Sequence, residues 1–269
     1  IKLMLEAEER CDERGDVCVG TVVVSFYKYT CLGYGQLTEA VAQQERLESS
    51  LGLSGRVLIA TEGVSGTVQG VSGAIVTYEA AVEETFGPVD WKRSNAGLAV
   101  LFPDFAVKQV EELVGFGVGP LSADNVGEHL PPEEFHRLLN ETCPDDLRIV
   151  DVRNTFEYEI GHFSHAENPR MSHTAQWPRY VDRHLDDFRG KSVMLYCTGG
   201  IRCEKASAYL IQRLAEGHRK EGECTRVCQL EGGIHKYLEA FPSGGHFLGK
   251  NFVFDKRASQ SPAAGGVVV

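Results

Sequence analysis

A cysteine followed by two glycines and an arginine, within residues 197–203, constrains this chain more than any other feature. The segment reads Cys-Thr-Gly-Gly-Ile-Arg-Cys. Residues 192–196 before it are apolar and partly β-branched, which is typical of a buried strand, and apolar residues recur at helical spacing in 204–211. The sequence therefore predicts a strand that ends at Cys197 and a helix that begins a few residues later.

This junction favours a reactive thiol. The glycines allow a tight turn, so that successive backbone N–H groups form an anion-binding nest. The helix N-terminus adds the positive end of its dipole, and Arg202 adds a permanent positive charge. All three stabilise a thiolate, so we expect Cys197 to be a nucleophile near neutral pH, with Arg202 as its anion stabiliser. The alternative is a buried structural cysteine in a tight turn.

The rest of the loop supplies further candidate site residues. We expect the substrate to contact the four residues between the cysteine and the arginine, Thr198, Gly199, Gly200 and Ile201. Cys203 is either a small packing residue at the start of the helix or a catalytic partner, and packing is the commoner role for a cysteine.

The second half of the chain alternates between strands and helices. Apolar strands are predicted at 147–153, 192–196 and 226–230, and helices at 180–188, after 203, and from 131 and 234. This is the pattern of a doubly wound α/β domain with a parallel sheet, in which ligands bind at the carboxyl ends of the strands. Asp151 and Arg153 lie at such an end and are candidate substrate-binding residues. Alternatively, Arg153 pairs with Asp151 or Glu157 and serves the structure.

The first half predicts a different domain. Its order is strand, helix, strand, strand, helix, strand, which indicates a ferredoxin-like, acylphosphatase-like α+β domain. The expected strands are 21–27, 56–60, 67–69, 90–94 and 98–102, with a tight link at 62–66 and helices at 37–51 and 75–86. A domain link is expected within 103–125. The predicted organisation is an N-terminal extension (1–16), the ferredoxin-like domain (17–115), the α/β domain (125–245) and a C-terminal tail (246–269).

Composition narrows the functional classes. The net charge of −11 over 269 residues argues against indiscriminate nucleic-acid binding, and DNA is not an expected partner. No run is apolar enough to predict a membrane span. The 8 cysteines are scattered, which favours a reducing compartment, the cytoplasm or an organelle, over a disulfide scaffold. Cys224 and Cys228 lack a second close pair, so no metal site is predicted.

Several segments resemble known proteins. Residues 151–153, 197–203 and 230–234 resemble a rhodanese domain. With 60–67, 151–158, 161–163 and 249–257 they resemble the tRNA uridine(34) hydroxylase family of rhodanese-containing proteins, over residues 20–257. The chain departs from that family at His165, where a glycine is usual, and in a longer, more charged segment at 216–224. The Cys-rich segment that usually follows Arg257 is not among the 269 residues, which leaves open any metal-binding or RNA-docking role of that segment.

The resemblance implies a ferredoxin-like domain followed by a rhodanese domain, and oxygen-dependent hydroxylation of the wobble uridine of tRNA. In the mechanism we hypothesise, the Cys197 thiolate adds to C6 of uracil, and Arg202 with the loop amides stabilises charge on O4. tRNA is the implied partner and dioxygen the implied co-substrate; no flavin, haem or iron-ligand motif identifies a cofactor. Basic residues are candidates for the RNA-facing surface, although a solvated surface explains each alone: Lys205, Arg213, Lys250, Lys256 and Arg257.

Three other functions compete with this one. A sulfurtransferase would carry a persulfide on Cys197, stabilised by the same loop. A phosphatase is less favoured, because related phosphatases have one residue more than the Cys-x4-Arg spacing found here. A non-enzymatic binding module is disfavoured by the intact cysteine loop. The oligomeric state and the tRNA species stay open.

Overall fold

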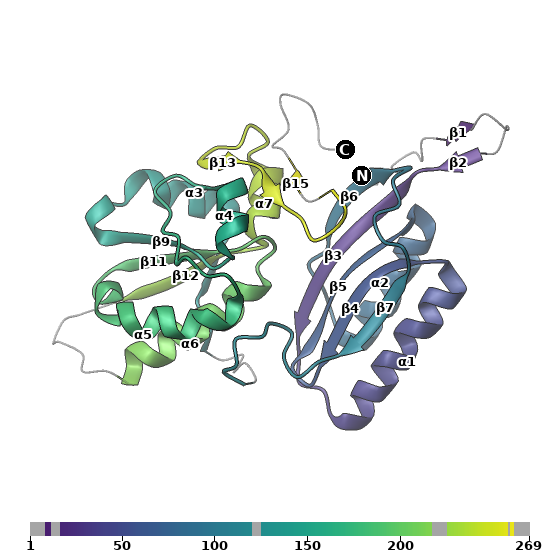
Figure 1. Cartoon of the computed structure of the whole chain (residues 1–269), viewed down its shortest axis with the longest axis horizontal. Helices are drawn as coiled ribbons and strands as arrows, with labels where there is room; N and C mark the ends of the chain where they lie inside the picture. Colours follow the sequence, from purple (N-terminus) through teal and green to yellow (C-terminus); the bar gives the residue numbers. More distant parts are fainter. Residues whose placement is uncertain (1–8, 12–16, 120–124, 217–224, 258, 261–269) are drawn as a thin grey trace. The chain divides into compact units, whose positions relative to one another are not determined.

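The computed structural model describes residues 9–11, 17–119, 125–216, 225–257 and 259–260. The chain divides into two compact units (Figure 1). The first ends at Leu113 and also includes residues 254–257, and the second extends from Val114 to Val253. Each unit has its own sheet and its own buried core.

The first unit is a five-stranded sheet with two helices on one face (Figure 1). The strand order is β6-β3-β5-β4-β7, antiparallel except where β7 pairs with β4. Alternate side chains of the strands, such as Val24 and Val57, pack with Leu37 of α1 and Tyr78 of α2 in one core. The elements are β3 (Thr21–Tyr29), α1 (Tyr34–Leu51), β4 (Ser54–Ala60), β5 (Gly63–Val71), α2 (Ser72–Phe86), β6 (Lys92–Gly97) and β7 (Phe105–Gln109). The predicted ferredoxin-like architecture is confirmed.

Three local predictions in this unit are wrong. The apolar run at 98–102 is not a strand; instead Leu101 and Phe102 are buried with Val23 in a small cluster on the sheet. The missing strand is β7, which lies inside the stretch predicted as the domain link. The expected link at 62–66 is almost entirely strand β5, which begins at Gly63. Apolar content alone did not distinguish residues that cover a sheet from residues that pair within it.

The second unit is a four-stranded parallel sheet with helices on both faces (Figure 1). The strand order is β8-β12-β11-β9. Side chains of α5 and α6 share one core with Val193 and Leu195, while those of α3 and α7 share another with Met194. The elements are β8 (Glu128–Leu130), α3 (Pro132–Glu141), β9 (Leu147–Asp151), α4 (Thr155–Ile160), α5 (Trp177–Phe188), β11 (Ser192–Tyr196), α6 (Ile201–Glu216), β12 (Arg226–Leu230) and α7 (Gly233–Ala240). The predicted doubly wound α/β domain is confirmed.

Short strand pairs complete the described part. β10 (Gly161–Phe163) pairs with β13 (Phe247–Gly249), and β14 (Asn251–Phe252) pairs with β15 (Ser259–Gln260). β1 (Glu9–Cys11) pairs with β2 (Val17–Val19), so part of the predicted N-terminal extension is a strand. The rest of 1–16, most of 258–269 and residues 217–224 lie outside the described residues.

His165, the residue that replaces a usual family glycine, has a left-handed backbone. Its φ is 63°, in the region that glycine adopts without cost and that strains other residues. The turn between β10 and the following segment therefore explains why a glycine suits this position.

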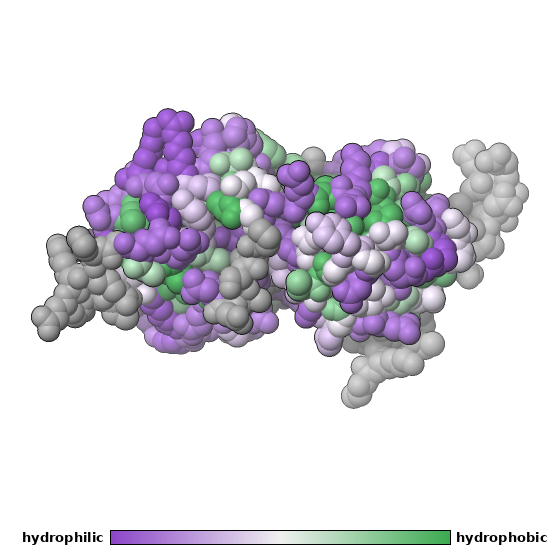
Figure 2. All heavy atoms as spheres, turned by 90° about the horizontal axis from the view of Figure 1, so that it is seen from below, coloured by the Kyte–Doolittle hydropathy of each residue, from purple (hydrophilic) through white to green (hydrophobic). Residues whose placement is uncertain are grey.

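None of the helices in the part of the chain that the structure describes is long and apolar enough to cross a membrane. Among the residues that the structure describes, nine large hydrophobic side chains are exposed, and they come from several different elements. On the face shown in Figure 2, hydrophobic residues form separate patches among hydrophilic ones.

Candidate active site

Cys197 lies at the edge of the parallel sheet where the strands end. It directly follows β11, the strand paired on both sides, with β12 and β9. β11 is central and apolar because both of its faces are covered. The carboxyl ends of β9 and β11 therefore bring Asp151 and Cys197 to one edge, as the sequence predicted.

Backbone contacts hold the cysteine loop in one shape. The N–H of Gly200 donates to Cys197 Sγ at 3.1 Å, and Gly200 has a φ of 100°, which favours glycine. From the first turn of α7, the N–H of Ile234 donates to the Cys197 carbonyl at 3.0 Å, and that of His235 to the Thr198 carbonyl at 3.1 Å.

Gly233, the first residue of α7, packs closely against this loop. A Cβ at Gly233 would lie 2.6 Å from the Cys197 carbonyl oxygen and 2.7 Å from the Gly199 nitrogen, both backbone atoms. Gly233, the second of the two glycines after β12, is therefore part of the site's framework. Sequence reasoning placed a turn there but not this close approach to the loop.

Arg202 forms a two-pronged ion pair with Glu157. Its Nη1 donates to Oε2 at 2.7 Å and its Nη2 to Oε1 at 2.8 Å. Thr198 Oγ1 accepts a further bond from Nη2 at 3.1 Å. Burial would raise the pKa of Glu157, but the charge and hydrogen bonds of Arg202 outweigh burial and lower it. The carboxylate therefore stays ionised and keeps the guanidinium in place.

Glu157 is a site residue that sequence reasoning missed, since it was considered only as a partner of Arg153. It lies in the first turn of α4, is fully buried, and accepts the N–H of Asn154 at 3.0 Å. A Glu three residues after an Asn is a helix-start signal, which explains its position in the helix. Nothing in that local signal identifies a partner 45 residues away.

The environment of Cys197 favours the thiolate. Burial alone would raise the pKa of the thiol. The opposing effects are a hydrogen bond from Cys203, the charge of Arg202, and backbone N–H groups of Arg202 and Gly200, and together they lower the pKa to about 5. Cys197 is therefore ionised at neutral pH, which is the state that a nucleophile requires.

Cys203 supports this thiolate from the first turn of α6. It is fully buried, and burial followed by its contact with Cys197 raises the pKa of its thiol well above the usual value. A thiol that stays protonated can donate its S–H to the neighbouring thiolate. Cys203 thus acts on Cys197, beyond the packing role that the sequence favoured, and we treat it as a positioning residue.

Asp151 and Arg153 form a buried ion pair. Arg153 Nη2 donates to Asp151 Oδ2 at 2.6 Å and Nε to Oδ1 at 2.9 Å. The exposed fractions of the Arg153 and Asp151 side chains are 0% and 1%. Nη2 also donates to the Gly161 carbonyl at 2.6 Å, which ties the end of β9 to β10. These contacts support the alternative in which Arg153 pairs with Asp151 and stabilises the structure. Arg153 Nη1 has no hydrogen-bond partner among the described residues, and a substrate-binding role for the pair stays a prediction.

The remaining loop residues are the more accessible ones. Thr198, Gly199 and Ile201 are half-buried, and a Cβ at Gly199 would meet no atom within 4 Å. This open side is where we expect substrate contacts, which stay a prediction for all four loop residues, the buried Gly200 included.

One of the basic residues predicted to face RNA is buried instead. Lys205 is buried at 1% exposure and donates to the Val114 carbonyl at 3.3 Å. Arg213 is paired with Asp182, and Arg257 with Asp255. Among the described residues, no three His, Cys, Asp or Glu side chains are grouped so as to hold a metal ion; Cys224 lies outside them.

This fold and this loop define a rhodanese-domain protein. Residues 131–240 match the family model of the rhodanese-like domain, and residues 21–113 match that of the UPF0176 acylphosphatase like domain. Both agree with the two domains predicted from the sequence.

Three relatives extend the match over most of the chain. Rhodanese-like domain-containing protein 6 of Arabidopsis thaliana is 37% identical over 88% of this chain and 43% of its own length. The tRNA uridine(34) hydroxylases of Synechocystis and Acinetobacter baylyi are 35% and 34% identical over 88% of this chain, and over 81% and 72% of their own lengths. The chain spans less than half of the plant relative. It belongs to the tRNA uridine(34) hydroxylase family, and the predicted resemblance is confirmed.

Proposed function

We propose that this chain hydroxylates C5 of the wobble uridine of tRNA, with Cys197 as the nucleophile. The observation that carries the proposal is the stabilised thiolate of Cys197 at the carboxyl edge of the sheet, with a pKa of about 5. The names of the bacterial relatives support tRNA uridine as the substrate. A tRNA substrate places the activity in the cytoplasm or in an organelle that carries out translation.

The chemistry begins with addition of the Cys197 sulfur to C6 of uracil. The electrons of the C5–C6 double bond move toward O4, and the positive charge of Arg202 and the loop N–H groups stabilise this enolate. C5 then bonds to dioxygen. Two electrons and two protons from an external reductant leave one oxygen on C5 and release the other as water. Loss of the C5 proton and of the thiolate from C6 restores the ring double bond.

Glu157 and Cys203 assist without touching the substrate. Glu157 holds Arg202 through both terminal nitrogens, so the positive charge stays beside the loop. The Cys203 thiol stabilises the thiolate before addition and again when it leaves C6. Dioxygen as co-substrate, and the absence of a dedicated cofactor, are parts of the proposal.

Nucleoside mass spectrometry of tRNA tests the proposal. A host without its own wobble-uridine hydroxylation would express the wild type, Cys197→Ser, or Cys143→Ser, which changes an exposed free cysteine. Hydroxylated uridine with the wild type and with Cys143→Ser, and none with Cys197→Ser, is the expected result. A uridine that none of the chains modifies, together with thiocyanate formation from thiosulfate and cyanide that depends on Cys197, would instead establish the sulfurtransferase.

A further inference from the structure

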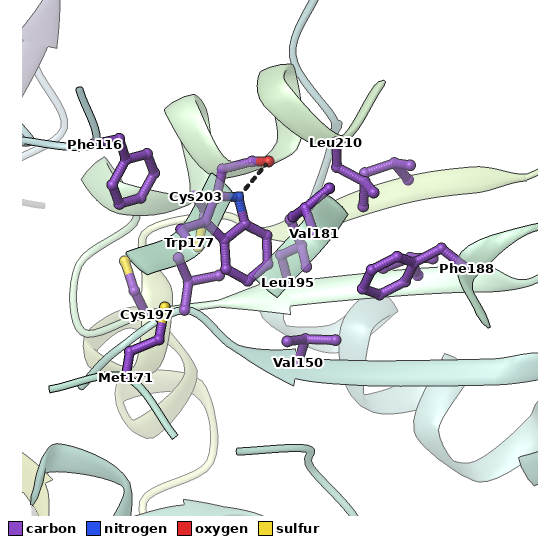
Figure 3. Packing of buried hydrophobic residues seen from close by; sticks show 14 of the residues in the cluster. Phe116, Val150, Met171, Trp177, Val181, Phe188, Leu195, Cys197, Cys203 and Leu210 are labelled. Carbon is purple, nitrogen blue, oxygen red and sulfur yellow. Dashed lines mark hydrogen bonds between the residues drawn. The ribbon is translucent and has the colours of Figure 1, made fainter. Parts of the chain in front are cut away.

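Cys197 has no exposed surface, although a nucleophile must reach its substrate. Its exposed fraction is 0%, and it belongs to a buried cluster with Phe116, Met171, Trp177 and Cys203 (Figure 3). A planar base therefore cannot reach the sulfur until some of the groups that cover it move.

Two of the neighbours lie in helices, and the backbone of a third is bonded to the start of one. Trp177 is the first residue of α5, and its Nε1 donates to the Ala206 carbonyl at 3.1 Å. Cys203 lies in the first turn of α6. The Met171 carbonyl accepts the N–H of Thr155 at the start of α4 at 2.7 Å. Displacing Trp177 or Cys203 would break helix contacts, and shifting the backbone at Met171 would disturb the start of α4.

Phe116, like Met171, lies outside every helix and strand, but the backbone around it differs. Its side chain is 2% exposed, and Figure 3 shows it at the same end of the cluster as Cys197. Glycines flank it at 115 and 117, and Gly117 has a φ of 70°. Glycine adopts many backbone conformations without strain, so the chain can change direction on both sides of this ring.

The N–H of Phe116 donates to the Val114 carbonyl at 2.9 Å, a bond within the segment itself, and long side-chain hydrogen bonds join the carbonyls before Phe116 to other elements. Lys205 Nζ donates to the Val114 carbonyl at 3.3 Å, and Thr174 Oγ1 to the Gly115 carbonyl at 3.5 Å. Both distances are at or beyond the long end of the usual range, so these bonds are weak. Residues 114–117 can therefore shift at a lower cost than the helices that carry Trp177 and Cys203.

We propose that the Phe116 ring occupies the place of the target base beside Cys197 and is displaced when a base enters. A phenyl ring and a pyrimidine are both flat six-membered rings, and the sulfur, the thioether of Met171 and the indole of Trp177 make an apolar seat for one. The seat favours a single-ring base over a purine. This inference rests on the proposed function for the identity of the base.

The position of the base in tRNA agrees with this seat. Enzymes that act on a base take it out of its stack, which costs least for an unpaired base. When the base enters, it replaces the Phe116 ring, so the apolar side chains around the sulfur stay covered while Phe116 is displaced. The ring thereby also shields the thiolate from water and oxidants when no RNA is bound.

Alkylation of Cys197 by iodoacetamide, followed by peptide mass spectrometry, tests the placement of Phe116 without RNA. Phe116→Ala is compared with Phe188→Ala, which removes an equally buried ring from the far end of the same cluster (Figure 3). We expect Cys197 to react at least about tenfold faster in Phe116→Ala than in the wild type, because a closed state suppresses the reaction by its opening equilibrium. Phe188→Ala should react at the wild-type rate.

Equal rates for Phe116→Ala and the wild type would overturn the proposal, and so would equal acceleration by both variants. Phe116→Leu keeps an apolar side chain and controls for a folding defect. It should accelerate alkylation by less than Phe116→Ala does. An unchanged rate in both variants would refute the proposal that the Phe116 ring covers Cys197.

An anticodon stem-loop RNA then tests the occupant. With uridine at the wobble position it should protect Cys197 of Phe116→Ala from alkylation, and with a purine there it should protect less. Accelerated alkylation without any RNA protection would contradict the tRNA assignment alone and leave the position of Phe116 supported. Equal protection by uridine and purine would refute the single-ring selectivity.

Discussion

Replacing Cys203 by alanine should raise the pKa of Cys197 by one to two units. The Cys203 thiol is the first of the groups that lower this pKa, and both side chains are fully buried. A hydrogen bond to a charged group contributes about 1.5–3 kcal/mol, and one pKa unit corresponds to about 1.4 kcal/mol. The pKa should therefore rise from about 5 in the wild type to roughly 6–7 in the variant.

The pH dependence of iodoacetamide alkylation at Cys197 measures this shift. Cys203→Ser is the matched control, because its hydroxyl still donates and should keep the pKa near that of the wild type. The acid limb of the activity profile should move in the same direction, while activity at neutral pH falls little, since much of the thiol is still ionised. An unchanged pKa in Cys203→Ala, or an equal shift in Cys203→Ser, would refute a hydrogen-bonding role.

Three other changes test the framework of the site. Glu157→Gln should destabilise the fold by about 3–5 kcal/mol in urea unfolding, because it leaves the buried charge of Arg202 without its counter-charge; an unchanged midpoint would show that the pair is not needed. His165→Gly should stabilise the fold by about 0.5–1 kcal/mol by relieving the left-handed backbone, while Gly52→Ala, at a φ of 62°, should destabilise it; a loss in both would count against the strain at His165. The folded pKa of Cys197, about 5, lies below the usual 9.0, so the thiolate adds stability that is fully present above pH 9 and is lost as pH falls to 5. Thermal unfolding of the wild type and Cys197→Ser across this window should differ in slope, and parallel curves would contradict the lowered pKa.

Much of the architecture could be predicted because its signals are local. Residues 192–196 and 226–230 are strands with the predicted bounds, since an apolar run before a glycine turn is decided by its own residues. The junction of strand, cysteine loop and helix could equally be predicted, because its cysteine, glycines and arginine lie within a few residues of one another. The run at 98–102 was misread because its partner is a sheet face, not a neighbouring strand.

The sequence by itself determined the two folds, the strand–loop–helix junction and the cysteine at its start. Only the tertiary structure decided which side chains surround that cysteine. The strand order brings Asp151 beside Cys197, and α4 brings Glu157 to Arg202 across 45 residues. The segment after Leu113 places Phe116 in the cluster around the sulfur. Periodicity and turn signals depend on neighbours in the chain, whereas the pairing of buried charges and the filling of a buried seat depend on neighbours in space, which no local pattern records.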